Sequence, residues 1–353
     1  MRKLLILALS LFLVSSICNA YEYPYIYKGF RPMGMGGAFV AVSNDADALY
    51  YNPAGLADIE KTRASIFGLE IEAGKYTASL IKDALDTDFG SELESAEFLR
   101  DHMGERSHLG LAIVPNYSMP RFAFTVIGSG RMDMEVRDRQ YPKLDVGAIS
   151  DIGAGAGYAH PFLDNSLLVG ASAKYIYRQS LIKEYTVADL SDELADTIKD
   201  DLEKGSGILF DLGAIYKFGQ FSFANPQVGI SANNLIGSKL GSAADATQHV
   251  DIGMAASKDL GFTAATFAMD YVDIFNQFDQ DDDITKRLRL GVESKFYEIL
   301  FVRAGLYQGY LTAGLNLDAK AVRLDLMTYA EEVGAYSGQR VDRRYAGRFF
   351  FGF

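Results

Sequence analysis

Apolar and polar side chains alternate along most of this chain, and this period of two constrains its fold more than any other feature. In residues 122–137, FAFTVIGSGRMDMEVR, one set of alternate positions is apolar or glycine throughout. The other set carries Arg131, Asp133, Glu135 and Arg137. The pattern recurs in 287–295 and 322–326. Since successive side chains of a strand point to opposite faces, each segment predicts a strand with one apolar and one charged face.

The lengths of the connections distinguish two folds that would both show this alternation. We predict strands at 62–72, 108–117, 121–137, 144–159, 166–183, 207–218, 226–236, 248–257, 263–273, 286–296, 299–307, 309–317, 320–331 and 343–353. Connections after even-numbered strands are short, and several after odd-numbered strands are long, as transmembrane barrels show and soluble sandwiches need not. The predicted fold class is therefore all-β: a transmembrane antiparallel barrel of about fourteen strands over 62–353, with both ends on the periplasmic side.

The first twenty residues predict export. Arg2 and Lys3 precede an apolar run, and the small residues Cys18 and Ala20 fit a cut after residue 20, which makes 1–20 a secretory signal peptide. A lipoprotein would need a small residue where Ile17 stands. Cleavage removes the sole cysteine and leaves 32 basic and 46 acidic side chains, a net charge of −14. Export without disulfides favours a bacterial envelope, and the negative charge argues against nucleic acid as a partner.

Two long loops and the C-terminus carry further patterns. The spacing of Leu93, Ala96, Leu99 and Met103, and of Leu190, Leu194, Ile198 and Leu202, predicts short amphipathic helices, which we expect to cap the outer mouth. The alternating aromatic end, closing on Phe353, resembles the signal by which bacterial outer-membrane barrels engage their assembly machinery. The chain has no Trp, so its 21 Tyr and 23 Phe must supply the aromatic girdles that contact outer-membrane lipid.

Residues 21–61 precede the first predicted strand and are unusually rich in small and turn-forming residues. Gly34, Gly36 and Gly37 permit positive φ and close backbone approach, and Asn52-Pro53 starts a turn. A barrel of about fourteen strands leaves a lumen that wall side chains alone do not fill, since eight strands already leave just enough room for them. We therefore predict that 21–61 folds back as a plug, or hatch, inside the barrel.

The stretch GMGGAFVAVSNDADALYYNPAGLA resembles the N-terminal hatch of the FadL-type long-chain fatty acid transporters, the OMPP1/FadL/TodX group, with NPAGLA at 52–57 as its most specific part. RLRLGVE, RAGLYQGYLTAGL and EEVGAYSG are similar to the related PorV/PorQ and UPF0164-like barrels. The resemblance implies a fourteen-stranded barrel, a lumen hatch and diffusion of hydrophobic compounds. It also implies sideways ligand exit at an inward-kinked strand, which the sequence alone does not locate.

Two sets of residues are candidate sites. The hatch set forms either a gate that moves on ligand binding or a fixed plug; it comprises Gly34, Gly36, Gly37, Asn52, Pro53, Ala54 and Gly55. The second set would lie on the lumen face of neighbouring strands and bind a fatty-acid carboxylate through guanidinium groups; it comprises Arg287, Arg289, Arg303 and Arg323. The alternative for the second set is internal pairing with Glu293, Asp325 and Asp270.

No sequence motif predicts a catalytic, metal or cofactor site. The four His are scattered without metal spacing, no nucleophile elbow is present, and the acidic stretch 279–286 lacks the glycine of a calcium loop. We therefore expect no enzyme activity, no metal and no cofactor. The predicted function is a bacterial outer-membrane channel for passive uptake of hydrophobic small molecules, long-chain fatty acids first among them, gated by the hatch. The alternative is a PorV-like barrel that acts in protein secretion or as a structural surface protein.

Overall fold

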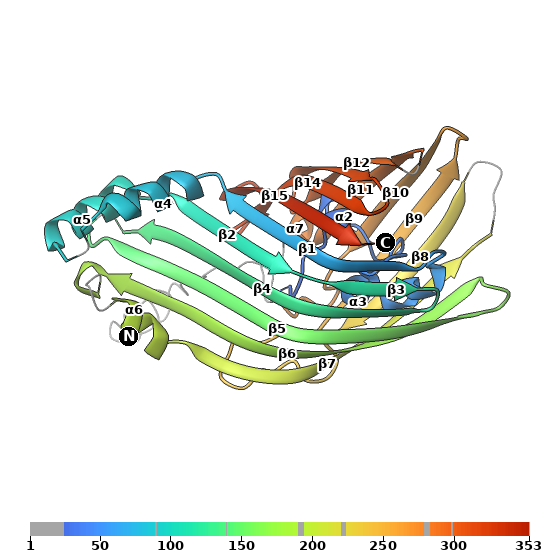
Figure 1. Ribbon diagram of the computed structural model, residues 1–353, viewed down its shortest axis with the longest axis horizontal. Helices are drawn as coiled ribbons and strands as arrows, with labels where there is room; N and C mark the ends of the chain where they lie inside the picture. Colours follow the sequence, from blue (N-terminus) through green and yellow to red (C-terminus); the bar gives the residue numbers. More distant parts are fainter. Residues whose placement is uncertain are drawn as a thin grey trace, which may run out of the picture.

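The chain forms a closed antiparallel β-barrel (Figure 1). The computed structural model describes residues 25–88, 90–138, 140–189, 194–219, 224–278, 283–297 and 299–352. Within them, 15 strands make one sheet, which closes because β1 pairs with β15. The strands are β1 (Arg63–Gly74), β2 (Arg106–Ile113), β3 (Asn116–Met119), β4 (Phe122–Arg137), β5 (Lys143–Phe162), β6 (Leu167–Thr186), β7 (Glu203–Lys217), β8 (Asn225–Asn233), β9 (His249–Asp259), β10 (Thr263–Tyr271), β11 (Leu288–Phe296), β12 (Leu300–Tyr307), β13 (Tyr310–Asp318), β14 (Val322–Glu332) and β15 (Val341–Gly352).

The predicted count of fourteen strands is confirmed, with one strand in two pieces. Both β2 and β3 pair with β1 on one side and β4 on the other, so they share one position in the wall. The predicted strand 108–117 is therefore interrupted at Val114 and Pro115. The strand predicted at 286–296 begins only at Leu288, because Ile284–Arg287 form a helical turn, α7. The leader 1–20, Leu190, residues 279–282 and Phe353 lie outside the described residues.

The two faces of the wall differ as the alternation predicts. Outward positions such as Phe124, Ile152 and Leu212 are exposed and apolar. Lumen positions carry charge, and Arg178 and Arg344 are fully buried there. Short turns gather at one end of the barrel and the longer loops at the other, and β1 starts and β15 ends at the short-turn end. None of the described helices combines the length and the apolar character needed to cross a membrane.

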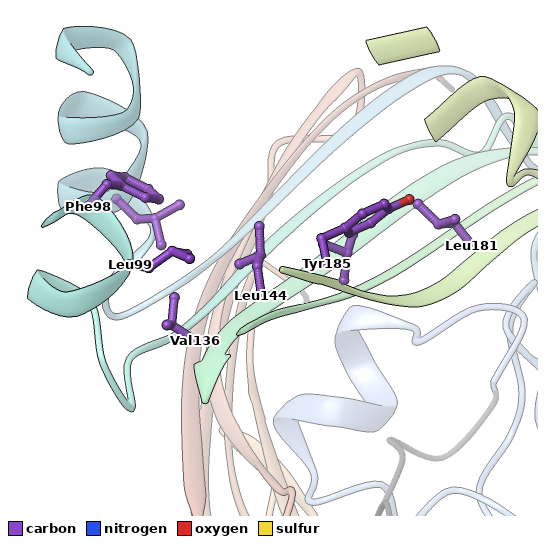
Figure 2. Packing of buried hydrophobic residues seen from close by; sticks show 8 residues of the cluster. Phe98, Leu99, Val136, Leu144, Leu181 and Tyr185 are labelled. Carbon is purple, nitrogen blue, oxygen red and sulfur yellow. The ribbon is translucent and has the colours of Figure 1, made fainter. Parts of the chain in front are cut away.

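The long-loop helices pack against the outside of the wall, so the prediction that they cap the mouth is wrong. These helices are α4 (Thr77–Asp86), which the sequence analysis missed, α5 (Glu92–Asp101) and α6 (Leu194–Asp200). Phe98 and Leu99 of α5 meet Val136 of β4 and Leu144 of β5 (Figure 2). Val136 pairs with Leu144, on the outward face of both strands. We call this the outer cluster; it comprises Leu80, Phe98, Leu99, Val136, Leu144, Val146, Leu181 and Tyr185.

The outer cluster exists because the wall is taller on this side. Strands β5 and β6 each have 20 residues, whereas a membrane-spanning strand needs about 9–11. Beyond the membrane, an apolar outward face would meet water. Burying it under amphipathic helices removes that apolar surface from water, which is the dominant favourable contribution to folding.

Residues 25–61, the N-terminal segment, lie against the lumen face of the wall. The segment contains α2 (Phe30–Gly34), α3 (Ala48–Tyr51) and the 3-10 turn η1 (Pro53–Asp58). Its side chains pack on β12–β15 through Phe30 and Met33 and on β9 and β10 through Phe39. Leu49 and Leu56 pack on β4 and β5. One segment therefore contacts strands around most of the barrel.

Glycines on the lumen face let the backbone of this segment touch the backbone of the wall. A Cβ on Gly229 would sit 2.8 Å from the Val40 carbonyl oxygen, one on Gly305 would sit 2.5 Å from the Gly36 nitrogen, and one on Gly314 would sit 3.0 Å from the Gly34 Cα. We call the lumen-facing glycines that lie against the segment the lumen glycines; Gly170, Gly229, Gly291, Gly305 and Gly314 meet its backbone, and Gly157, Gly213 and Gly253 meet its side chains. No other residue type fits at such distances without moving one of the two chains.

The lumen glycines generate the first prediction. Gly305→Ala places its Cβ against backbone atoms of both the segment and β11, so we expect it to lower the free energy of unfolding by about 1–3 kcal/mol, as overpacking does. Urea titration of the barrel refolded into lipid vesicles measures this. Gly130→Ala is the matched control, since its added Cβ meets nothing within 4 Å. Equal stability of the two variants would contradict the close contact.

Candidate functional site

The structure places all seven residues of the predicted hatch set in the lumen, against the wall. Gly36 and Gly37 have φ of 66° and 79°, the left-handed region that glycine adopts without strain. Gly34 lies beside Arg303 and Gly314, and Gly55 packs on the backbone of Ser43. Ala54 is buried between Leu168 of β6 and Ile215 of β7.

Asn52 is the polar centre of the N-terminal segment. Its Nδ2 donates to the Val40 carbonyl oxygen at 2.8 Å, and its Oδ1 accepts from the Ala54 N–H at 3.1 Å, capping η1. The same Nδ2 lies 3.3 Å from the Ile230 oxygen in β8. Pro53 follows at the first position of η1, where its missing N–H and fixed φ suit a helical start. The asparagine thus ties two parts of the segment to each other and to the wall.

Charged pairs hold the segment to the other side of the barrel. Arg31 donates from Nη2 to Glu293 Oε1 at 2.9 Å, and Arg303 donates from Nε to Glu293 Oε2 at 2.6 Å. Arg31 also pairs with Asp45 at 2.9 Å within the segment. Asp270 of β10 accepts from the backbone N–H groups of Phe39 and Val40. Because Glu293, Arg303 and Asp270 are buried, removing a partner leaves a charge uncompensated, which makes each of these contacts hard to break singly.

The four predicted headgroup arginines lie at different heights in the barrel. Arg287 belongs to α7 and donates to the Asp273 carbonyl oxygen at the long-loop end. Arg289, near that end of β11, lies 4.0 Å above the Tyr307 ring centre. Arg303, in the middle of β12, lies 2.6 Å from Glu293 and 3.8 Å from Asp325. Arg323, near the short turn between β13 and β14, pairs with Asp318 at 3.4 Å. The structure does not gather them into one cluster.

A cavity of about 80 Å³ separates the start of the N-terminal segment from β1, β2 and β4. Ile26, Tyr27 and Phe30 line it from the segment. The wall side mixes small and apolar residues with charged ones and includes Gly110, Leu111, Ala112, Glu70, Glu72, His108, Arg131 and Arg344. Tyr27 donates to Glu70 at 2.8 Å across its edge. The cavity is smaller than the ~150 Å³ space that holds a benzene molecule, so a ligand must displace part of its lining.

The wall beside this cavity is irregular. Between β2 and β3, Val114 and Pro115 belong to neither strand, and Pro115 has no N–H to donate to the ladder. Its carbonyl oxygen still accepts from Val126 of β4 at 2.9 Å. On the other side of β1, the register of its pairing with β15 shifts between Ser65 and Phe67. Ala112, two residues before the break, lines the cavity. The lumen cavity and the interrupted strand therefore adjoin.

Sequence reasoning missed several residues of this site. Arg31, Tyr27 and Glu70 carry no motif, and their partners are distant in the sequence, as with Arg31 and Glu293. Pro115 is the one readable signal, since a proline in a predicted central strand argues for an interruption. Within the described residues, no three His, Cys, Asp or Glu side chains converge as a metal site would require.

The geometry defines a class: a closed fourteen-position barrel with an apolar outward face and a lumen occupied by its own N-terminal segment. No family profile matches the chain, and no curated protein matches it in sequence. Solved structures do resemble it, as the sequence analysis predicted.

Three of these structures belong to the group whose hatch the sequence resembles. The toluene transporter TbuX of Ralstonia pickettii is 12% identical, with 92% of this chain and 97% of that chain covered and a TM-score of 0.49. The toluene transporter TodX of Pseudomonas putida is 10% identical, with 92% and 97% covered and a TM-score of 0.47. A Pseudomonas aeruginosa FadL homologue is 11% identical, with 94% and 98% covered and a TM-score of 0.48.

Asn52 generates the second prediction. Asn52→Ala removes the cap of η1 and leaves the buried Val40 carbonyl oxygen without its donor, so we expect a loss of about 1–3 kcal/mol in the free energy of unfolding. Urea titration in lipid vesicles measures the change. Asn225→Ala is the control: Asn225 is exposed at the start of β8, and we expect a change within about 0.5 kcal/mol. A stability equal to the control's would show that Asn52 does not anchor the segment.

Proposed function

We propose that this protein is an outer-membrane channel for passive uptake of hydrophobic small molecules, including long-chain fatty acids. The outward apolar face suits lipid, and closure of the sheet leaves no unpaired strand edge in the hydrocarbon, where each unsatisfied backbone group costs several kcal/mol. The long-loop end would face the exterior and the short-turn end the periplasm. Export by the predicted signal peptide fits this location.

One observation carries the proposal: the lumen cavity adjoins the interrupted strand position between β2 and β3. Transfer of a hydrophobic molecule from the lumen into periplasmic water is unfavourable. At an interrupted strand it would instead move sideways into the bilayer and remain in apolar surroundings throughout. The break at Val114 and Pro115 supplies such a place, since the wall has fewer ladder hydrogen bonds to lose there.

Gating would involve only the start of the N-terminal segment. Residues 34–54 contact the lumen glycines and the buried Asn52 network, which opposes movement of that part. Tyr27, Lys28 and Phe30 border the cavity, and the side chains of Tyr27 and Lys28 contact Glu70 and Glu331 of the wall. Displacing them would enlarge the cavity without removing the plug. On this proposal, residues 25–30 are the gate and the remainder of the segment is a fixed stopper.

A role in protein secretion or as a structural surface protein is the second candidate, and one observation favours it. The cavity of about 80 Å³ is well below the ~300–1,000 Å³ of ordinary ligand pockets. A barrel that merely presents its loops to another protein needs no larger space. Uptake measurements distinguish the two functions, because a sealed barrel would carry nothing.

Filling the cavity tests uptake directly. Ala112→Phe places a ring beside the wall break, and we expect it to lower the uptake rate of radiolabelled oleate and toluene about ten-fold, equivalent to ~1.4 kcal/mol on the barrier. The measurement uses cells that lack their own channel for these compounds. Ala313→Phe, at an exposed outward position of β13, is the matched control and should transport normally. Absence of uptake by the unmodified protein would instead favour the second candidate.

The headgroup role of the arginines stays a prediction with its own test. If guanidinium groups hold the carboxylate, Arg303→Ala and Arg323→Ala should each weaken laurate or oleate binding about ten-fold, or ~1.4 kcal/mol, and leave toluene binding unchanged because toluene has no carboxylate. Titration calorimetry in detergent measures both ligands. Unchanged laurate affinity in both variants would assign Arg303 to bracing the barrel through Glu293 and Asp325.

A further inference from the structure

A second cavity, of about 270 Å³, lies on the outward face of the wall, beneath the outer cluster. Two rungs of the sheet form its floor. The upper rung runs Leu109–Met132–Ala148–Leu181 across β2, β4, β5 and β6, and the lower rung runs Leu111–Gly130–Ser150–Gln179. Small residues at the centre, with larger ones at both sides, make a depression, which we call the outer groove.

The rims of the outer groove are apolar. The next rung towards the short-turn end carries Ile113 and Ile152, which are 45% and 61% exposed on either side of Gly128. At the opposite edge, Leu202 lines the groove and packs against the outer cluster. Arg131 also lines the groove, although it lies in the lumen-facing register of β4, and its Nη1 donates to the Tyr25 carbonyl oxygen on the lumen side. The groove therefore presents mostly hydrocarbon to whatever occupies it.

The groove lies at the upper edge of the membrane-facing band. Gly130 follows the first residue of β4, Phe122, by eight positions, which at a tilt of about 40° rises roughly 20 Å above the short-turn end. An outer-membrane barrel has an apolar band about 25 Å tall. Below the groove the outward face continues as lipid-facing residues such as Phe124 and Val126. The groove is thus continuous with the surface that meets the bilayer and opens at the level of its outer leaflet.

Helix α4 extends the same apolar surface. Its apolar positions Leu80, Ile81, Ala84 and Leu85 form one stripe, of which Leu80 and Ala84 pack on the outer cluster. Ile81 and Leu85 remain 39% and 82% exposed. A helix with an unburied apolar edge beside a membrane surface lies in the interface, with that edge towards the acyl chains.

We propose that the outer groove binds one acyl chain of an outer-leaflet membrane lipid and so fixes that lipid against the wall between β2 and β6. The proposal rests on the barrel spanning the membrane and not on transport. A lipid is favoured over transported cargo because the β2–β4 and β4–β5 ladders are continuous between the groove and the lumen cavity, although Leu111, Gly130 and Arg131 line both.

The test compares lipid retention in variants of the full mature chain. The protein is refolded into dioleoylphosphatidylcholine vesicles, extracted in mild detergent and examined by native mass spectrometry. We expect one retained phospholipid. Gly130→Leu fills the floor of the groove and should lower the retained fraction about ten-fold. Ala304→Leu, at an exposed outward position of β12 on the opposite wall, is the matched control and should retain lipid as the unmodified protein does.

Two results would overturn the proposal: equal retention by all three proteins, or retention of a free alkyl compound instead of a phospholipid. A second measurement covers the case in which Gly130→Leu fails to fold. The chain has no Trp, so Gln179→Trp places a single reporter at the side of the groove. Brominated acyl chains should quench it more strongly than a reporter introduced by Val292→Trp on the opposite wall, and equal quenching would contradict a bound chain.

Discussion

Direct contact between two backbones, that of the N-terminal segment and that of the wall, is the constraint on which the rest of this structure depends. At several of the lumen glycines, such as Gly229, Gly305 and Gly314, no side chain separates the two. With that approach fixed, Asn52 reaches the carbonyl oxygens of Val40 and Ile230, and Arg31 reaches Glu293. The N-terminal segment is therefore packed directly onto the wall.

The same contacts determine which part of the N-terminal segment is proposed to move. Backbone contacts against the lumen glycines hold the middle of the segment, whereas its start meets the wall through side chains beside a small cavity. That cavity adjoins the one strand position that proline interrupts. On the outward face of the wall, the outer cluster buries apolar surface that the tall strands would otherwise expose. The outer groove lies beneath this cluster. The proposed function is thus located at the cavity, where packing is incomplete. The contacts that stabilise the segment lie at the lumen glycines, where packing is tight.

The fold was largely predictable, and the site only in part. Period-two alternation and the sorting of loops specify fourteen positions because both follow from which face of each strand is apolar. The hatch set could be named because glycine and Asn-Pro have local conformational meaning. Arg289, Arg303 and Arg323 lie on the lumen face of their strands but do not cluster, because a shift of a few residues along a tilted strand moves a side chain by several ångströms. Arg287 left its strand altogether for α7.

The sequence by itself determined the closed barrel, the faces of its strands and the presence of a compact segment before the first strand. These depend on local periodicity and on residues whose backbone preferences are intrinsic. Only the tertiary structure decided that α4 and α5 cover the outside of the wall, that Arg31 joins Glu293 and that the interruption at Pro115 borders a cavity. Each of these joins residues far apart in the chain, and their meeting depends on barrel closure, which brings β1 beside β15 and the segment across the lumen.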